Sequence, residues 1–134
     1  MGRFDVILID THVWIWLHSE PEKLSAEALQ SLETSSGIAI STISIYETMV
    51  AVEKGRVTSH LEPETVVRRW LSSWEITRIP VSEEIVIQSR TQKFDHADPF
   101  DRLIASTALN ENLPLMTADR NLLRLEWLTA LPAQ

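Results

Sequence analysis

The chain has 134 residues, of which 44% are hydrophobic and 23% charged, as expected for one globular domain over residues 1–134. Its net charge of −7, from 19 acidic and 12 basic residues, argues against a protein that binds nucleic acid simply by coating phosphates with lysine. It has no cysteine, which excludes disulfides, zinc–thiolate sites and thiol nucleophiles and is compatible with a cytoplasmic location.

The first half of the chain predicts two strands among three helices. Residues 4–9 form a short apolar run that is rich in β-branched residues, typical of a buried parallel strand. The run is far too short to span a bilayer and acidic residues flank its apolar part, so we expect neither a membrane segment nor a signal peptide. Helices are expected over residues 11–18, 25–32 and 43–53, with a second strand over residues 38–41.

The second half continues the alternation. An amphipathic helix is expected over residues 63–74, a strand over 75–79 and helices over 82–90 and 99–110. A strand over residues 114–117 and a short helix after residue 119 complete the series. Strands separated by helices predict a three-layer α/β fold, with a mainly parallel sheet of about four to five strands covered on both faces. In such folds, ligands bind at the carboxyl ends of the strands.

Acidic residues gather at this predicted edge. Asp10 directly follows the first strand, and Asp119 comes two residues after the strand over residues 114–117. Glu47 lies one turn into the helix after the second strand, whereas Asp98 and Asp101 open a later helix, where the helix dipole favours an anion. Each acid alone has an ordinary explanation as a cap, a turn residue or a solvated side chain. Capping does not explain why four separate elements bring acids to one edge, where ionised groups destabilise the fold unless a cation neutralises them.

The chemistry of these ligands favours a hard cation. Carboxylate oxygens without clustered histidine or cysteine select Mg²⁺ or Mn²⁺ over zinc. Magnesium binds through few carboxylates together with substrate phosphates, which suits the hydrolysis of a phosphodiester. A bound ion lowers the pKa of a coordinated water and stabilises the charge on the leaving oxygen. The sequence is compatible with either one ion or two.

Four short motifs carry a resemblance to a known family. In chain order they read LIDTH from residue 8, STISIYE from residue 41, DPFDRLIA from residue 98 and LMTAD from residue 115. With this order and spacing the chain resembles a PIN-domain ribonuclease of the VapC type, the toxin component of a type II toxin–antitoxin pair. The resemblance covers residues 6 to about 125 and implies a PIN-like fold and a metal-dependent endoribonuclease that hydrolyses RNA. It also implies a homodimer and an antitoxin whose peptide arm occupies a groove leading to the metal site.

The resemblance assigns roles to individual residues. The acids that it places in catalysis and in Mg²⁺ or Mn²⁺ binding are Asp10, Glu47, Asp101 and Asp119. Asp98 matches an additional acid in the D-P-F-D subgroup and is expected in the pocket, either as a ligand or just behind the ligands. Hydroxyl positions beside the acids, which would orient a carboxylate or a metal-bound water, are Thr11, Ser44 and Thr117. Arg102 is expected to neutralise a neighbouring acid or to contact phosphate.

Other residues with suitable chemistry have simpler expected roles. We expect His12 to be packed or partly exposed rather than a catalytic base, and contact between His96 and an RNA phosphate is a secondary hypothesis. The five tryptophans are many for this length, and core packing or an apolar interface is favoured over base stacking.

Three other function classes stay open at this stage. A phospho-acceptor receiver domain has a similar size, sheet and acidic pocket, but we would expect it to present a lysine near Thr117. A haloacid-dehalogenase-type phosphatase would have a second acid two residues after Asp10, where His12 stands. A catalytically inactive interaction module would retain only antitoxin or dimer contacts, and the intact set of acids argues against it.

Overall fold

A parallel five-stranded sheet forms the centre of the protein. The computed structural model describes residues 6–134, which contain β1 (Val6–Ile9), β2 (Gly37–Ser41), β3 (Ile76–Ile79), β4 (Leu115–Thr117) and β5 (Ala130–Pro132). The strand order is β3-β2-β1-β4-β5, and every neighbouring pair is parallel. The predicted α/β class and parallel sheet are confirmed. The order differs from the 2-1-3-4-5 order of receiver domains.

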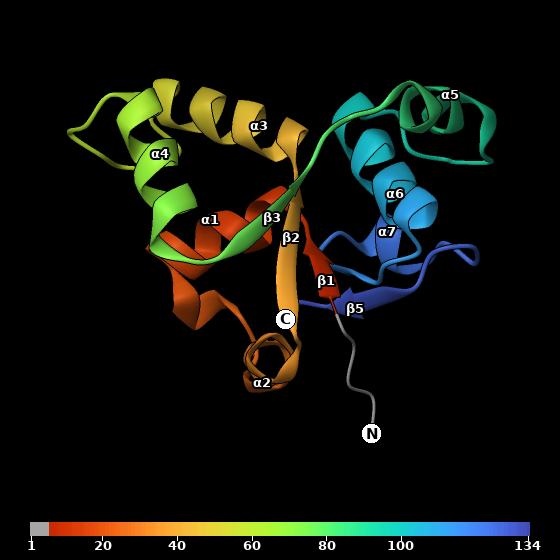
Figure 1. The fold of residues 1–134 in the computed structure, drawn as a ribbon, viewed down its shortest axis with the longest axis horizontal. Coiled ribbons are helices and arrows are strands. Elements are labelled where there is room, and N and C mark those ends of the chain that lie inside the picture. The colour runs from red at the N-terminus through yellow and green to blue at the C-terminus, as the bar shows by residue number, and fades with distance from the viewer. Residues whose placement is uncertain (1–5) are drawn as a thin grey trace.

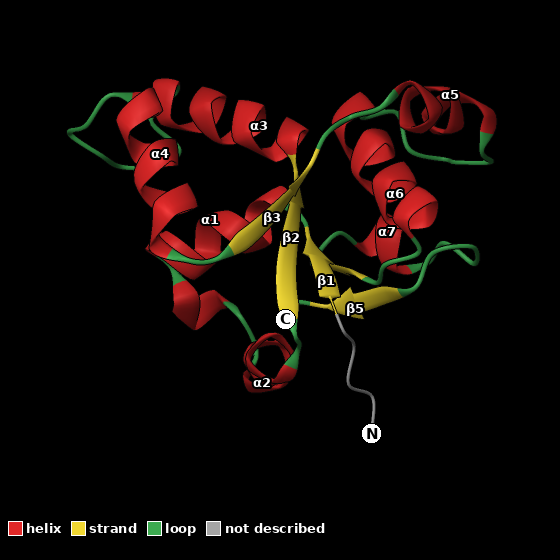
Figure 2. Cartoon of the chain, in the orientation of Figure 1, coloured by secondary structure: helices red, strands yellow, loops and turns green. Residues whose placement is uncertain are grey.

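Helices cover both faces of the sheet (Figure 1). On one side lie α1 (Thr11–Ser19), α3 (Thr42–Glu53) and α4 (Pro63–Ser73), and on the other lie α5 (Glu83–Thr91), α6 (Pro99–Glu111) and α7 (Arg120–Leu123). After the short turn η1 (Pro21–Lys23), α2 (Ala26–Thr34) packs on the α1 side through Ala28 and Leu32. Figure 2 shows the strands as a yellow layer between the red helices. Among residues 6–134, no helix has the length and apolar content that crossing a membrane requires.

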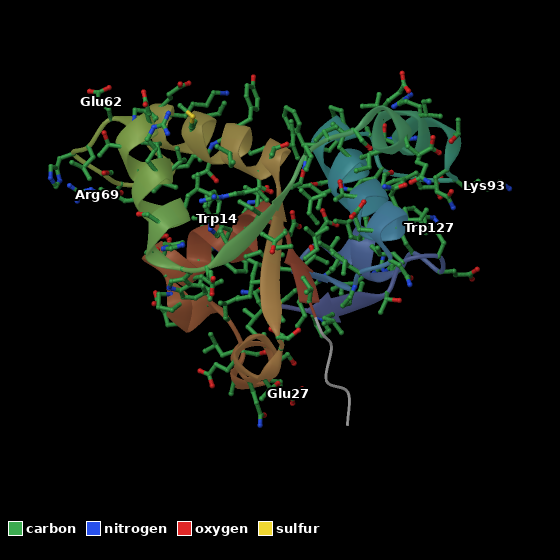
Figure 3. The ribbon with its side chains drawn as sticks, in the orientation of Figure 1. Trp14, Glu27, Glu62, Arg69, Lys93 and Trp127 are labelled. Atoms are coloured by element: carbon green, nitrogen blue, oxygen red, sulfur yellow. The ribbon has the colours of Figure 1, made fainter. Side chains whose placement is uncertain are left out.

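Alternation along the strands divides the core into two clusters. Ile7 and Ile9 of β1 join the cluster on the α1 side, whereas Leu8 between them joins the cluster that contains residues of α6. Burial on both faces explains why β1 is apolar throughout. Trp14 is fully buried in the first cluster, and Figure 3 shows it within the helical layer on that side. The expectation of core packing is therefore confirmed for this tryptophan.

Two segments differ from the sequence expectations. The predicted first strand begins at Phe4, but Phe4 and Asp5 lie outside the described residues, and the described strand starts at Val6. β5 was not predicted, because it has three residues and ends at a proline. It nevertheless pairs in parallel with β4 as an edge strand, a position where proline is tolerated.

The carboxyl ends of the strands lead directly into helices. Asp10 follows β1 and is the N-cap of α1, and Ser41 ends β2 and is the N-cap of α3. Asp119 follows β4 and is the N-cap of α7. The buried residues Ile104 and Ala105 of α6 pack in the same cluster as Leu8, which brings the beginning of α6 toward this edge. Helices that are far apart in the sequence therefore begin close together, at the carboxyl edge of the sheet.

Candidate metal centre

Asp10 lies buried at the centre of the acidic edge and is 3% exposed. Its Oδ1 accepts the backbone N–H of Thr11 at 2.8 Å, and its Oδ2 accepts the hydroxyl of Thr117 at 2.7 Å. The Thr117 oxygen in turn accepts the backbone N–H of Asp119 at 3.0 Å, so one buried hydroxyl joins the ends of β1 and β4. Burial raises the pKa of Asp10 and outweighs the two hydrogen bonds that stabilise its charge.

Glu47 is held to α1 by the hydroxyl of Thr11, which is also bonded to the hydroxyl of Ser44. The Thr11 hydroxyl lies 2.6 Å from Oε1 of Glu47 and 2.8 Å from the hydroxyl of Ser44. Because a hydroxyl has one proton, Thr11 donates to the carboxylate, and Ser44 supplies the proton of the other hydrogen bond. Burial raises the pKa of Glu47 to about 7; repulsion from Asp10 and Asp98 adds to this rise, and the Thr11 hydrogen bond opposes it.

The two acids that begin α6 have different surroundings. Asp98 is exposed and is the N-cap, with its Oδ1 accepting the backbone N–H of Phe100 at 2.9 Å. The Asp101 side chain is 17% exposed and lies among the other acids. Burial raises the pKa of Asp101 to about 7, and repulsion from Asp10 and Asp98 adds to the rise. The capping explanation therefore applies to Asp98 and leaves the position of Asp101 unexplained.

One imidazole lies between two of the carboxylates. Nε2 of His96 is 2.8 Å from Oδ2 of Asp101 and 3.1 Å from Oδ2 of Asp119. Burial lowers the pKa of His96, but its interactions with these acids outweigh burial and raise it. Burial also acts to raise the pKa of Asp119, but hydrogen bonds from His96 and from the backbone of Leu122 and Asn121 lower it.

Sequence reasoning missed this role of His96. With Asp101 and Asp119 it forms a group whose ligand atoms all lie within 4.8 Å of one another, close enough to surround one cation. Its position two residues before Asp98, in the segment that leads into α6, was the available signal. The contact with Asp119, 23 residues away, could not be inferred from local pattern.

Arg102 does not neutralise the acids. Its Nε donates to the Ser89 carbonyl at 2.8 Å, and its Nη1 donates to the carbonyls of Phe94 and His96 at 3.2 and 3.0 Å. Its guanidinium carbon also lies 4.9 Å from the centroid of the Phe94 ring. Within residues 6–134, none of the ion pairs includes Arg102. Arg102 instead holds the connection between α5 and α6 through three carbonyl groups, and its contact with a phosphate stays a prediction.

The donor set fits a hard divalent cation. Repulsion acts among the carboxylates of a quartet of acids, Asp10, Glu47, Asp101 and Asp119, and the pKa is raised at the first three of them. In the described part of the chain, no lysine or arginine forms an ion pair with any member of the quartet. A dication among these oxygens would favour their ionised forms and remove the repulsion.

Comparison with known proteins agrees with this architecture. A family model described as the PIN domain matches residues 7–128. The chain belongs to the PIN-domain family. This confirms the resemblance inferred from the four motifs, and it removes support from the receiver and phosphatase alternatives.

The PIN domain is similar to proteins of toxin–antitoxin systems. It is 29% identical to ribonuclease VapC22 of Mycobacterium tuberculosis over 116 residues, covering 87% of this chain and 88% of that protein. It matches a chain of a toxin–antitoxin complex from Klebsiella pneumoniae with a TM-score of 0.70 and 26% identity, covering 96% and 98% of the two chains. A chain of VapBC2 from Rickettsia felis, bound to a promoter DNA fragment, gives a TM-score of 0.70 at 20% identity, covering 96% and 99%, and shows the shared fold.

Proposed function

We propose that this PIN domain is a Mg²⁺-dependent endoribonuclease, in which Mn²⁺ can replace Mg²⁺, and the toxin of a type II toxin–antitoxin pair. The observation that carries the proposal is the cluster of carboxylates at the strand edge, which has no lysine or arginine partner among residues 6–134. The similarity to ribonuclease VapC22 and to a chain of a toxin–antitoxin complex supports RNA as the substrate and an antitoxin as the partner. Such an enzyme would meet its RNA in the cytoplasm.

Four acids would hold the cation: Asp10, Glu47, Asp101 and Asp119. The chemistry that a bound cation would supply there is a lower pKa for a nucleophilic water and stabilisation of the charge on the leaving oxygen. The chain's part is to fix the directions of the ligand oxygens. Thr117 holds one oxygen of Asp10, and the Thr11 hydroxyl, which is itself bonded to the Ser44 hydroxyl, holds one oxygen of Glu47, so the other oxygens keep defined positions.

Asp98 would act at the rim of this centre. It is exposed and caps α6, but its charge raises the pKa of both Glu47 and Asp101. A carboxylate near enough to repel both groups adds to the attraction for a cation. We therefore propose that Asp98 increases metal affinity, either as a ligand or through its charge alone.

A homodimer is part of the same proposal. Exposed apolar side chains offer contact area for a second chain, since Trp74 is 41% exposed and Val86 and Ile87, adjacent on α5, are 47% and 50% exposed. Light scattering of the purified protein measures the mass directly. A monomer at all concentrations would contradict this part of the proposal and leave the nuclease assignment intact.

An RNA cleavage assay tests the function. Purified protein is incubated with structured RNAs in Mg²⁺, in Mn²⁺ and in chelator, and internal cleavage is expected only with metal. Glu47→Gln should reduce the cleavage rate by roughly a hundredfold or more, because it removes a ligand. Glu53→Gln, an exposed position at the other end of α3, is the matched control and should cleave like the wild type.

Two results would overturn the assignment. If Asp10→Asn and Asp101→Asn both cleave RNA as fast as the wild type, the acidic cluster is not the active site. If the wild type cleaves no RNA with either metal but a small phosphodonor gives acid-labile phosphorylation of an aspartate, the protein is a phospho-acceptor.

A further inference from the structure

A cleft adjoins the acidic cluster on the α6 side of the sheet. It has a volume of about 780 Å³, and its wall includes Lys93, Phe94, His96, Asn121, Arg124 and Trp127. His96 belongs to both sites, since its Nε2 also lies 2.8 Å from Oδ2 of Asp101. Asn121 lies two residues after Asp119 and donates its backbone N–H to that carboxylate at 2.8 Å. The cleft and the candidate metal centre are therefore neighbours that share His96.

We propose that this cleft binds one or two nucleotides of single-stranded RNA beside the phosphodiester that is cleaved, with Lys93 and Arg124 contacting phosphate. The inference rests on the proposed ribonuclease function and adds the surface that holds the substrate. The volume lies in the range of small-molecule pockets, about 300–1,000 Å³, so a nucleotide fits.

In the described part of the chain, the two positively charged side chains of the cleft are available to contact phosphate. Lys93 and Arg124 are exposed, and neither takes part in an ion pair within residues 6–134. Asp95 and Glu126 also line the cleft, so its formal charge is balanced. The net charge of the cleft would therefore not attract RNA. Binding would depend on contacts between RNA and the side chains of Lys93 and Arg124, beside the bound metal.

Hydrogen bonds from the side chains of Trp127 and Arg102 hold the segment that carries Lys93. The indole Nε1 of Trp127 donates to the Lys93 carbonyl at 3.0 Å, and Nη1 of Arg102 donates to the carbonyls of Phe94 and His96. The rings of Phe94 and Trp127 also lie 5.5 Å apart. Figure 3 shows Lys93 and Trp127 on the side of the sheet that carries α5, α6 and α7.

These contacts favour a single strand over a duplex. Three carbonyl groups of this segment are occupied by hydrogen bonds, which holds the wall in one shape before RNA arrives. Phe94 and Trp127 are partly exposed in the wall of the cleft, and a base that stacks on the exposed part of either ring must be unpaired. A base inside a duplex has no free face to offer.

RNA binding without cleavage tests the proposal. In an Asp101→Asn background with Mg²⁺, the affinity for a fluorescein-labelled, unstructured RNA oligonucleotide of mixed sequence is measured by fluorescence anisotropy at several salt concentrations. Lys93→Gln and Arg124→Gln should each weaken binding roughly threefold to tenfold and reduce the slope of log Kd against log salt by about 0.7. In the active enzyme the same changes should raise KM and leave kcat near its wild-type value.

Lys54→Gln and Arg56→Gln are the matched controls. These substitutions remove the same charge as Lys93→Gln and Arg124→Gln. Both residues are exposed and lie between α3 and α4, at the opposite end of the molecule (Figure 1). They should leave the RNA affinity and the salt slope unchanged. Arg124→Lys keeps the charge and should retain the affinity, which separates phosphate contact from a structural role at the end of α7.

Three outcomes are distinguishable. If Lys93→Gln and Arg124→Gln bind RNA with wild-type affinity and salt slope, the cleft is not an RNA subsite. If they keep RNA affinity but lose binding to the cognate antitoxin, the cleft holds the partner, and the proposal is equally overturned. If the wild type cleaves no RNA with metal, the ribonuclease function fails, and the binding measurements still decide the role of the cleft.

Discussion

Asp101 has an unfavourable charge in the metal-free protein, since burial and neighbouring acids raise its pKa from 3.8 to about 7. Below pH 3.8 the folded and unfolded chains are both protonated, and the group does not lower the free energy of unfolding. As the pH rises from there to about 7, the unfolded chain releases a proton that the folded chain keeps. This contribution therefore destabilises the fold progressively and levels off above about pH 7.

Asp101→Asn should relieve this penalty. In chelator at about pH 8, we expect the variant to be more stable than the wild type by about 1–3 kcal/mol, and the difference to shrink toward pH 4. Urea denaturation at both pH values measures it. Asp95→Asn, at an exposed position, is the control and should show no such difference. A stability difference that does not change with pH would show that repulsion at Asp101 is not its source.

Asp98 allows capping to be separated from metal binding. Asn caps a helix as well as Asp, so Asp98→Asn should leave the free energy of unfolding nearly unchanged, whereas Asp98→Ala should lower it by about 1 kcal/mol. If Asp98 contributes charge to the centre, both variants should also bind Mg²⁺ more weakly, by less than Asp101→Asn does. Denaturation and metal titration measure the two effects. Unchanged metal affinity in both variants would restrict Asp98 to capping.

At the scale of the elements, the side chain of Arg102 holds the connection between α5 and α6. Arg102→Lys should lower the free energy of unfolding by about 1–3 kcal/mol, because one ammonium cannot replace donors to the carbonyls of Ser89, Phe94 and His96. It should also speed amide exchange in residues 93–97. Arg90→Lys, at an exposed position on α5, is the control. Normal stability in Arg102→Lys would mean that the connection is held by other contacts.

The elements that could be predicted are those with local signals. β1 is a short apolar run, α6 begins with an Asp-Pro cap, and the acids at the strand ends follow from the parallel topology. The positions of His96 and Arg102 depend on contacts between distant segments, such as the hydrogen bond from Trp127 to Lys93. β5 has too few residues for a periodic pattern and is held by pairing with β4. Local sequence patterns therefore located the acids but did not predict the cleft beside them.

For the whole molecule, the net charge of −7 opposes RNA binding, and a cation held by the acids at the strand edge would reduce the negative charge where a phosphate would lie. The fold concentrates carboxylates there, and two of them have a pKa near 7. Metal binding near neutral pH should therefore release protons. Metal binding would therefore link the stability, the charge and the proposed activity of the PIN domain.

Titration calorimetry with Mn²⁺ at about pH 7, repeated in buffers of different ionisation enthalpy, tests the central claim most directly. We expect the wild type to bind Mn²⁺ and release protons, Glu47→Gln to bind at least about tenfold more weakly, and Glu53→Gln to match the wild type. Absence of Mn²⁺ binding, or equal affinity in all three proteins, would contradict the claim that the four acids form a metal centre.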